Sequence, residues 1–418
     1  MRIAAIGIVY ARMENAPPKK CRRRQRLSRS ASTVRWLADE PFRVLFPLGV
    51  LLGAAGVMLW PLFYWGKLGY YPLLPHARLM VEGFLAAFAF GFLGTAMPKV
   101  LEAPRFSPAE VAAWVLLLAG AAAAHLGHRI VVGDALFAAA ALVFCAGLGI
   151  RWLKRTGSPP PGFVLASLGP PCGLAGAMLA AWGAAIPFWG AFGLRLLHFG
   201  FLLLPLLGVG SFLFPRMLGT LRRGDGGAKP ARGFALAGAL AAGGAAVAGL
   251  ALEAAGFPRT GGGIVAAAAA IWFTAQTGWL RRSGAKGAFP VAVRCGIACL
   301  ILGPALTPFF PAQRIAMEHI TLAGGFGLLA FAAGARAVYG HSGQSEKFAH
   351  CPKSWWWLLG LALLAVSTRV SADFLPASRI AHHVYAALTW LAASVLYAVA
   401  VLPYVAMRDP EVEGDTAE

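Results

Sequence analysis

Histidine is the residue type in this chain best suited to bind a metal or a cofactor, and its placement is uneven. Of nine histidines, the five that stand near the starts of long apolar runs are His76, His198, His319, His382 and His383. Imidazole is a common ligand of haem iron and of copper, and helical bundles build such sites from side chains on facing helices. These five are therefore candidate cofactor ligands. His76 and His319 are the candidate metal ligands among them.

A second explanation holds for any single histidine of this kind: a hydrogen-bonded residue at the membrane interface. His125 and His128 end an apolar run and fit that explanation best. His341 lies about 22 residues beyond His319, close to the hydrocarbon thickness at 1.5 Å per helical residue, so these two histidines are not expected to share a metal. In an α-helix Gly327 lies about 80° around from His319. We expect it to clear space for a flat ligand; the alternative is that it only permits close helix packing.

Three arginines and one glutamate accompany these histidines. Arg78 and Arg369 are candidate cofactor-binding residues, because a planar guanidinium suits carboxylates such as haem propionates; Arg195 shares their half of the membrane. The alternative is that these arginines extend to the interface. Glu82 is the acidic residue most clearly inside an apolar run. It is expected to handle protons or to pair with an arginine.

The elements that position these residues are membrane helices. Hydrophobic residues make up 58% and charged residues 13% of the 418, and the mean hydropathy is +0.66. Soluble proteins carry roughly a quarter charged residues, and in lipid only helices and closed barrels satisfy their backbone groups. Long uninterrupted apolar runs favour helices. The fold class is therefore all-α, a polytopic membrane bundle of about twelve transmembrane helices: residues 43–65, 76–98, 108–127, 130–150, 162–186, 191–219, 232–255, 260–280, 289–309, 314–339, 354–374 and 379–406.

The charge pattern indicates domains and orientation. Residues 1–40 read as a basic, disordered cytoplasmic tail, residues 41–408 as the membrane domain and residues 409–418 as a short acidic tail. The positive-inside rule predicts that both termini lie in the cytoplasm; the family resemblance described below implies a bacterial cytoplasmic (inner) membrane. The net charge of +20 is concentrated before the first apolar run, which favours the lipid surface over nucleic acid as the partner. The start codon, Met1 or Met13, and the oligomeric state stay open.

Two further patterns, the cysteine spacing and the high content of Gly and Ala, say less about function. The six cysteines form no CxxC pair and are interpreted as small apolar residues. Frequent Gly and Ala predict close helix packing. We find no convincing two-half repeat of the kind many transporters have.

Two stretches resemble the NnrS family of membrane proteins. One is His319–Gly327, followed by Arg336–Gln344, which is similar to a family pattern of a helix-borne histidine, spaced glycines and a closing Arg-x-x-x-Gly-His-Thr-Gly-Arg. The other is His76–Phe84 with Gly91–Pro98, which is similar to the family's His-x-His-Glu-Met-x-x-Gly-Phe and Gly-Phe-Leu-Leu-Thr-Ala-x-Pro. The resemblance runs from about residue 41 to the end. It implies a haem- and copper-containing membrane protein associated with nitric oxide and nitrosative stress in bacteria.

The chain departs from that pattern at four positions. Arg78 and Leu79 replace the family's second histidine and the glutamate, Ser342 replaces threonine and Gln344 replaces arginine. A haem site that needs only His76 or His319 is compatible with these changes, whereas a copper site near residue 76 loses one ligand.

Three functions follow as hypotheses. The first is a haem-binding, and in part copper-binding, NnrS-type protein linked to nitric oxide metabolism or nitrosative stress, with nitric oxide or a nitrosylated ligand as its partner. The second is a secondary transporter of a small solute or metal. The third is a cofactor-free assembly factor for a respiratory complex. Whether the protein is an enzyme stays open.

Overall fold

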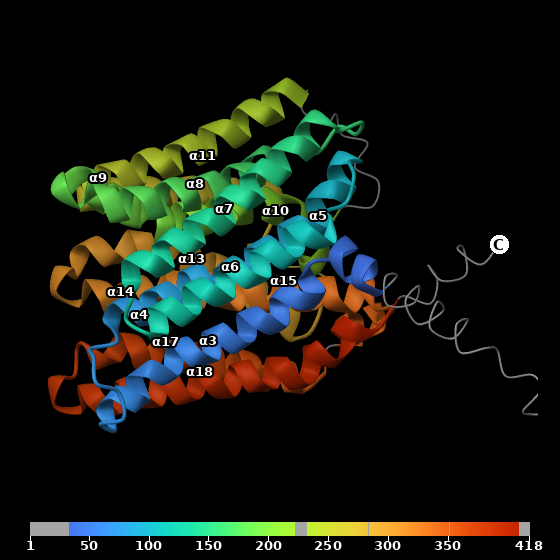
Figure 1. Cartoon of the computed structure of the whole chain (residues 1–418). Coiled ribbons are helices and arrows are strands. Elements are labelled where there is room, and N and C mark those ends of the chain that lie inside the picture. The colour runs from blue at the N-terminus through green and yellow to red at the C-terminus, as the bar shows by residue number, and fades with distance from the viewer. Residues whose placement is uncertain (1–32, 222–231, 283, 351, 409–418) are drawn as a thin grey trace, which may run out of the picture.

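The computed structural model describes residues 33–221, 232–282, 284–350 and 352–408. Within these ranges the chain is helical and contains no strand. Its long helices lie side by side in one bundle (Figure 1). Eleven of them are long and apolar enough to cross a membrane. A twelfth, α12 (Pro258–Thr277), is less apolar but packs between α11 (Arg232–Ala254) and α13 (Ala288–Leu306). The prediction of an all-α polytopic bundle is confirmed.

The remaining long helices have the following bounds: α3 (Phe42–Tyr64), α5 (Ala86–Leu101), α6 (Pro108–Leu126), α7 (Ile130–Leu153), α8 (Phe163–Trp182), α10 (Phe201–Leu218), α15 (Leu328–His341), α17 (Ser354–Ala372) and α18 (Arg379–Val401). Three of them, α5, α10 and α15, continue a short α-helix and a π-helical segment: α4 (Leu73–Arg78) with η1 (Leu79–Leu85), α9 (Pro187–Arg195) with η3 (Leu196–Gly200), and α14 (Arg314–His319) with η6 (Ile320–Gly327).

Both ends of the described chain meet at one end of the bundle. The Arg43 guanidinium, at the start of α3, donates to the carbonyl oxygens of Val405 at 2.7 Å, Met407 at 2.8 Å and His341 at 3.0 Å. An even number of crossings requires this arrangement. We call this the terminal end and the opposite one the far end. Residues 33–39, which the sequence analysis placed in the disordered tail, form a short helix there; residues 1–32 and 409–418 lie outside the described residues.

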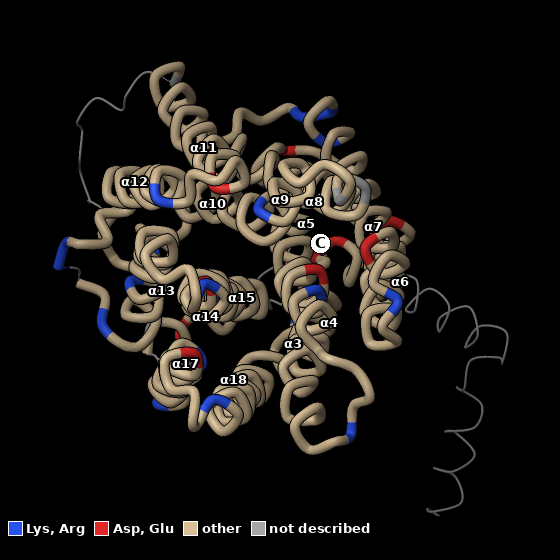
Figure 2. Tube along the Cα trace, turned by 90° about the vertical axis from the view of Figure 1, so that its left-hand side faces the viewer, with Lys and Arg blue, Asp and Glu red and all other residues tan. Residues whose placement is uncertain are grey.

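The bundle consists of three four-helix modules arranged as a ring. Module 1 runs from α3 to α7, module 2 from α8 to α12 and module 3 from α13 to α18. In each module the third helix packs on the fourth, and the fourth packs on the first helix of the next module; α18 closes the ring on α3. The second helices α5, α10 and α15 lie in the middle (Figure 2). The sequence search for two halves missed this threefold repeat.

Glycines at matching positions let the first helix of each module approach the second. The pairs are Gly49 and Gly56 in α3, Gly169 and Gly176 in α8, and Gly296 and Gly303 in α13. A Cβ at Gly176 would lie 2.5 Å from the backbone nitrogen of Leu197, and one at Gly56 3.1 Å from the Leu79 side chain. A side chain at Gly176 requires the backbone opposite to move, and one at Gly56 requires neighbouring side chains to shift, so the close approach favours glycine.

Candidate functional site

A cavity of about 350 Å³ opens in the far half of the bundle, between modules 3 and 1, with one wall from module 2. Small-molecule sites commonly have volumes of roughly 300–1,000 Å³. Six of the seven residues predicted as cofactor-binding line it: His76, Arg78, His198, His319, Arg369 and His383. They come from five different helical segments, so only the fold brings them together.

His382 is the predicted residue that does not line this cavity. Its Nδ1 lies 3.0 Å from the Ser378 hydroxyl and 3.1 Å from the Ser378 carbonyl oxygen, in the first turn of α18. Its neighbour His383 takes the inward position instead.

His76 and His319 face each other across the cavity. Their ring centroids lie 6.4 Å apart and their planes differ by 13°. His76 Nδ1 lies 3.0 Å from the Gly56 carbonyl oxygen, and His319 Nδ1 lies 2.6 Å from that of Ile315. Because a carbonyl only accepts, each Nδ1 carries the proton and each Nε2 keeps its lone pair. Metal-binding histidines are commonly oriented in this way.

Two polar atoms on the same cavity wall are buried without a hydrogen-bond partner among the described residues: Arg369 Nη1 and His383 Nε2. Both lie at ion-pair distance from Asp373: its Oδ2 lies 3.5 Å from Arg369 Nη1, and its Oδ1 lies 3.6 Å from His383 Nε2. His383 Nδ1 lies 2.7 Å from the Tyr64 hydroxyl. Buried polar atoms are nearly always satisfied, so these two indicate a place for a ligand.

Arg78 is already paired within the protein. Its Nε lies 2.8 Å from Asp134 Oδ1 and 3.2 Å from Glu82 Oε1, and its Nη2 lies 3.2 Å from Asp134 Oδ2. Its Nη1 lies 3.4 Å from His198 Nε2. Since arginine has no acceptor, His198 accepts at Nε2. Arg369 therefore suits the predicted carboxylate-binding role better than Arg78.

His125 corrects the sequence analysis, which predicted an interfacial residue. It is 1% exposed, and its Nε2 lies 2.9 Å from Glu82 Oε2. The last turn of α6 faces η1, so the ring turns inward against Gly133. His128 does lie at the surface, stacked on Tyr70 with centroids 4.8 Å apart. The buried set Arg78, Glu82, His125 and Asp134 is called the charge cluster below.

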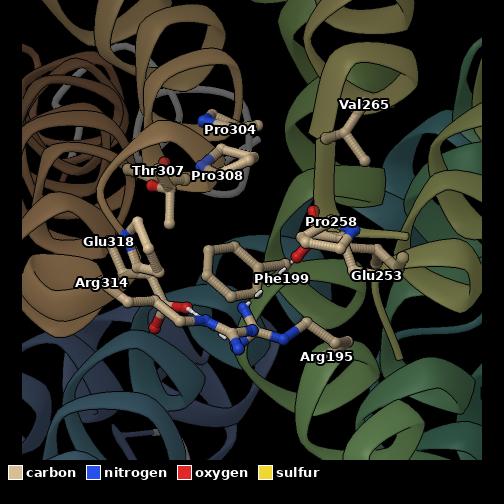
Figure 3. Close-up of a pocket in the computed structure, with 13 residues that line it drawn as sticks. Arg195, Phe199, Glu253, Pro258, Val265, Pro304, Thr307, Pro308, Arg314 and Glu318 are labelled. Atoms are coloured by element: carbon tan, nitrogen blue, oxygen red, sulfur yellow. Dashed lines mark hydrogen bonds and ion pairs between the residues drawn. The ribbon is translucent and has the colours of Figure 1, made fainter. Parts of the chain in front are cut away.

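A second cavity, of about 90 Å³, lies between modules 2 and 3 (Figure 3). Its polar wall consists of Arg195, Glu253, Arg314 and Glu318. Arg195 Nη2 lies 2.8 Å from Glu318 Oε1, and its Nη1 lies 3.7 Å from Glu253. The two cavities thus stand where modules meet, whereas the charge cluster lies within module 1.

The π-helical segments were not predicted. Each lies in the second helix of its module, directly after Arg78, around His198 and directly after His319. Such segments are rare and recur at functional sites. η6 also overturns the α-helical geometry assumed for Gly327. A Cβ added at Gly327 would lie 2.6 Å from the ring of Trp390, and Gly327 does not line the cavity. It makes room for a wall residue rather than for the ligand.

A separate polar cluster holds neighbouring helices together at the terminal end of the bundle. Glu40 accepts from the Arg43 Nε at 2.8 Å and pairs with His341. Burial acts to raise the pKa of Glu40, but the hydrogen bond and charge of His341 and the charge of Arg43 outweigh it and lower this pKa to about 2. His341 therefore lies at the terminal end, where it contacts Glu40 and Arg43.

These features define a polytopic helical membrane protein with a buried, histidine-lined cavity in one half of the bundle. The family model described as NnrS protein matches residues 36–408, nearly the whole chain. The chain belongs to the NnrS family. No curated protein matches it.

Proposed function

We propose that the histidine cavity holds a haem, with copper as the second candidate, and that the protein acts in nitric oxide metabolism or in the response to nitrosative stress. The observation that carries this proposal is the pair His76 and His319, whose Nδ1 atoms are fixed by main-chain carbonyls, while neither Nε2 atom has a hydrogen bond within the part of the chain that the structure describes. The assignment of nitric oxide derives from the resemblance to the NnrS family, and so does the bacterial inner membrane.

The residues present fit such a group. Imidazole is an axial ligand of haem iron, and Trp60, Trp390 and Met80 give the cavity apolar walls. Arg369, with a nitrogen that lacks a hydrogen bond, suits a carboxylate. A bound iron or copper would supply redox chemistry and a position for a diatomic ligand. Copper alone has weaker support, because Arg78 stands where the family has its second histidine.

The test is an absorption spectrum with metal analysis of the detergent-purified protein, expressed in haem-replete cells. We expect a Soret band that is lost when both His76 and His319 are replaced by alanine, while the yield of folded protein persists. A wild-type protein that contains neither haem nor copper would overturn the proposal, as would an unchanged spectrum in the double variant. Nitric oxide consumption by membranes containing the protein then separates turnover from sensing or carriage.

A further inference from the structure

We propose that the charge cluster is a proton-binding site that holds one proton and is coupled to the histidine cavity through Arg78. It lies deep in the far half of the bundle, where η1, α6 and α7 of module 1 meet. Arg78, Glu82, His125 and Asp134 are each at most 5% exposed. One ligand atom each of Glu82, His125 and Asp134 lies within 4.8 Å of the others.

The first step is a charge count. With His125 neutral, the cluster contains two carboxylates and one guanidinium, and its net charge is −1. An uncompensated charge away from water costs several kcal/mol. One added proton brings the net charge to zero, and a second would make it positive. The buried cluster is therefore most stable with one proton.

The second step places that proton. Both oxygens of Asp134 already accept hydrogen bonds from Arg78, at 2.8 Å and 3.2 Å. Glu82 Oε2 and His125 Nε2 face each other at 2.9 Å. Within the described ranges, Glu82 Oε1 has no hydrogen bond and forms only the ion pair with Arg78. The proton thus lies between Glu82 and His125, taken from water on binding and returned to water on release.

The third step identifies the charged and titratable groups that surround the cluster. The charges that act on Glu82 are those of Arg78, Asp134 and His125. From η3, His198 faces Arg78 at 3.4 Å, and the charge of Arg195 in α9 acts on His198 in turn. Both of these residues line the histidine cavity, as does Arg78. The guanidinium of Arg78 therefore contacts the cluster on one side and the cavity on the other.

This position couples the two sites. A metal cation bound among the cavity histidines repels Arg78 and the extra proton, so its binding favours proton release. By linkage, loss of the proton strengthens binding of the cation to the same extent. The coupling rests on the proposed function, whereas the proton site itself does not.

The proton site is tested on the purified full chain without added metal. The unfolding midpoint of the wild type should fall as pH rises through the value at which the cluster loses its proton, because the buried charge then becomes −1. Glu82→Gln leaves one carboxylate with Arg78 and should abolish this fall. Asp134→Asn gives the same charge count and the same expectation, should Glu82→Gln not accumulate. Glu110→Gln is the matched control, since the ion pair of Glu110 is with Arg151, at 2.5 Å, and involves no residue of the charge cluster; this variant should keep the fall.

Proton titration of folded wild type against Glu82→Gln gives a second reading, with one bound proton fewer expected in the variant. Equal proton counts, or a pH profile that Glu82→Gln leaves unchanged, would overturn the proposal. A bound metal ion that both cluster variants lose would replace the proton with a cation.

The coupling has its own measurement. Copper(I) added to the wild type should release a proton that Glu82→Gln does not release. Copper binding without this difference contradicts the coupling. Absence of any cofactor contradicts the proposed function and leaves the proton site to be judged by the stability and titration data.

Discussion

Arg195 and Glu318 form an ion pair of 2.8 Å that lines two cavities at once, the histidine cavity and the second cavity beside it. Each partner has an alternative. Glu253 lies 3.7 Å from Arg195, and Arg314 lies 3.0 Å from Glu318. The pair can therefore separate without leaving either charge unpaired (Figure 3).

We expect Glu318→Gln to ease passage between the two cavities, because it removes the charge that holds Arg195 in place. A partly exposed pair contributes about 1 kcal/mol, roughly a fivefold change in an opening equilibrium. The measurement is the rate at which a polar thiol reagent modifies a cysteine introduced at Ala387 in the histidine cavity, in each background. Glu253→Gln, which keeps the 2.8 Å pair, is the control. Equal rates in all three would show that the pair is no barrier.

The sequence predicted the helices well because about twenty apolar residues in a row have few other structures available in lipid. It also predicted that His76, His198, His319 and Arg369 belong together, since polar groups among apolar residues avoid lipid. It did not predict the role of His125, because the position of a residue near a helix end does not tell which way its side chain turns. The π-helical segments were missed too, since the extra residue in a turn leaves no pattern that apolar periodicity detects.

The orientation of the bundle in the membrane is a prediction from charge alone. Alkaline phosphatase fused after Arg408 should be inactive and a cytoplasmic reporter at the same place active, because basic loops stay in the cytoplasm. Arg43 contacts Val405 and Met407, so a reporter before residue 33 should give the same answer. Phosphatase activity at Arg408 would place the histidine cavity in the cytoplasmic half.

The terminal cluster predicts acid sensitivity. The pKa of Glu40 is lowered to about 2 from 4.5, so its contribution to stability is present above about pH 4.5 and is lost as pH falls towards 2. Glu40→Gln should lower the unfolding midpoint at neutral pH. The difference in midpoint between the variant and the wild type should become smaller as the pH falls through this range. Glu346→Gln, at an exposed position, is the control. A gap that stays constant with pH would mean that the ionised carboxylate contributes nothing.

The module interfaces predict which glycines tolerate a side chain. Gly176→Ala should destabilise the protein by about 1–3 kcal/mol, because its Cβ would lie 2.5 Å from the Leu197 backbone. Gly149→Ala meets nothing within 4 Å and should be neutral or mildly stabilising, since alanine favours helix. Thermal unfolding in detergent measures both. Equal midpoints for the two variants would contradict the close packing of α8 on η3.

The adjacent pair His382 and His383 gives the most direct test of the cavity. Both are histidines in the first turns of α18, so replacing either by alanine changes the intrinsic stability of the helix by the same amount. Only His383 lines the cavity, where its Nε2 lacks a hydrogen bond and its Nδ1 lies 2.7 Å from the Tyr64 hydroxyl. His383→Ala should shift the absorption spectrum or weaken cofactor retention during purification, because it removes a polar group from the wall of the site. His382→Ala should leave both unchanged, since its Nδ1 remains within the first turn against Ser378. The opposite order of effects would mean that the bound group lies outside this cavity, on the far surface of α18.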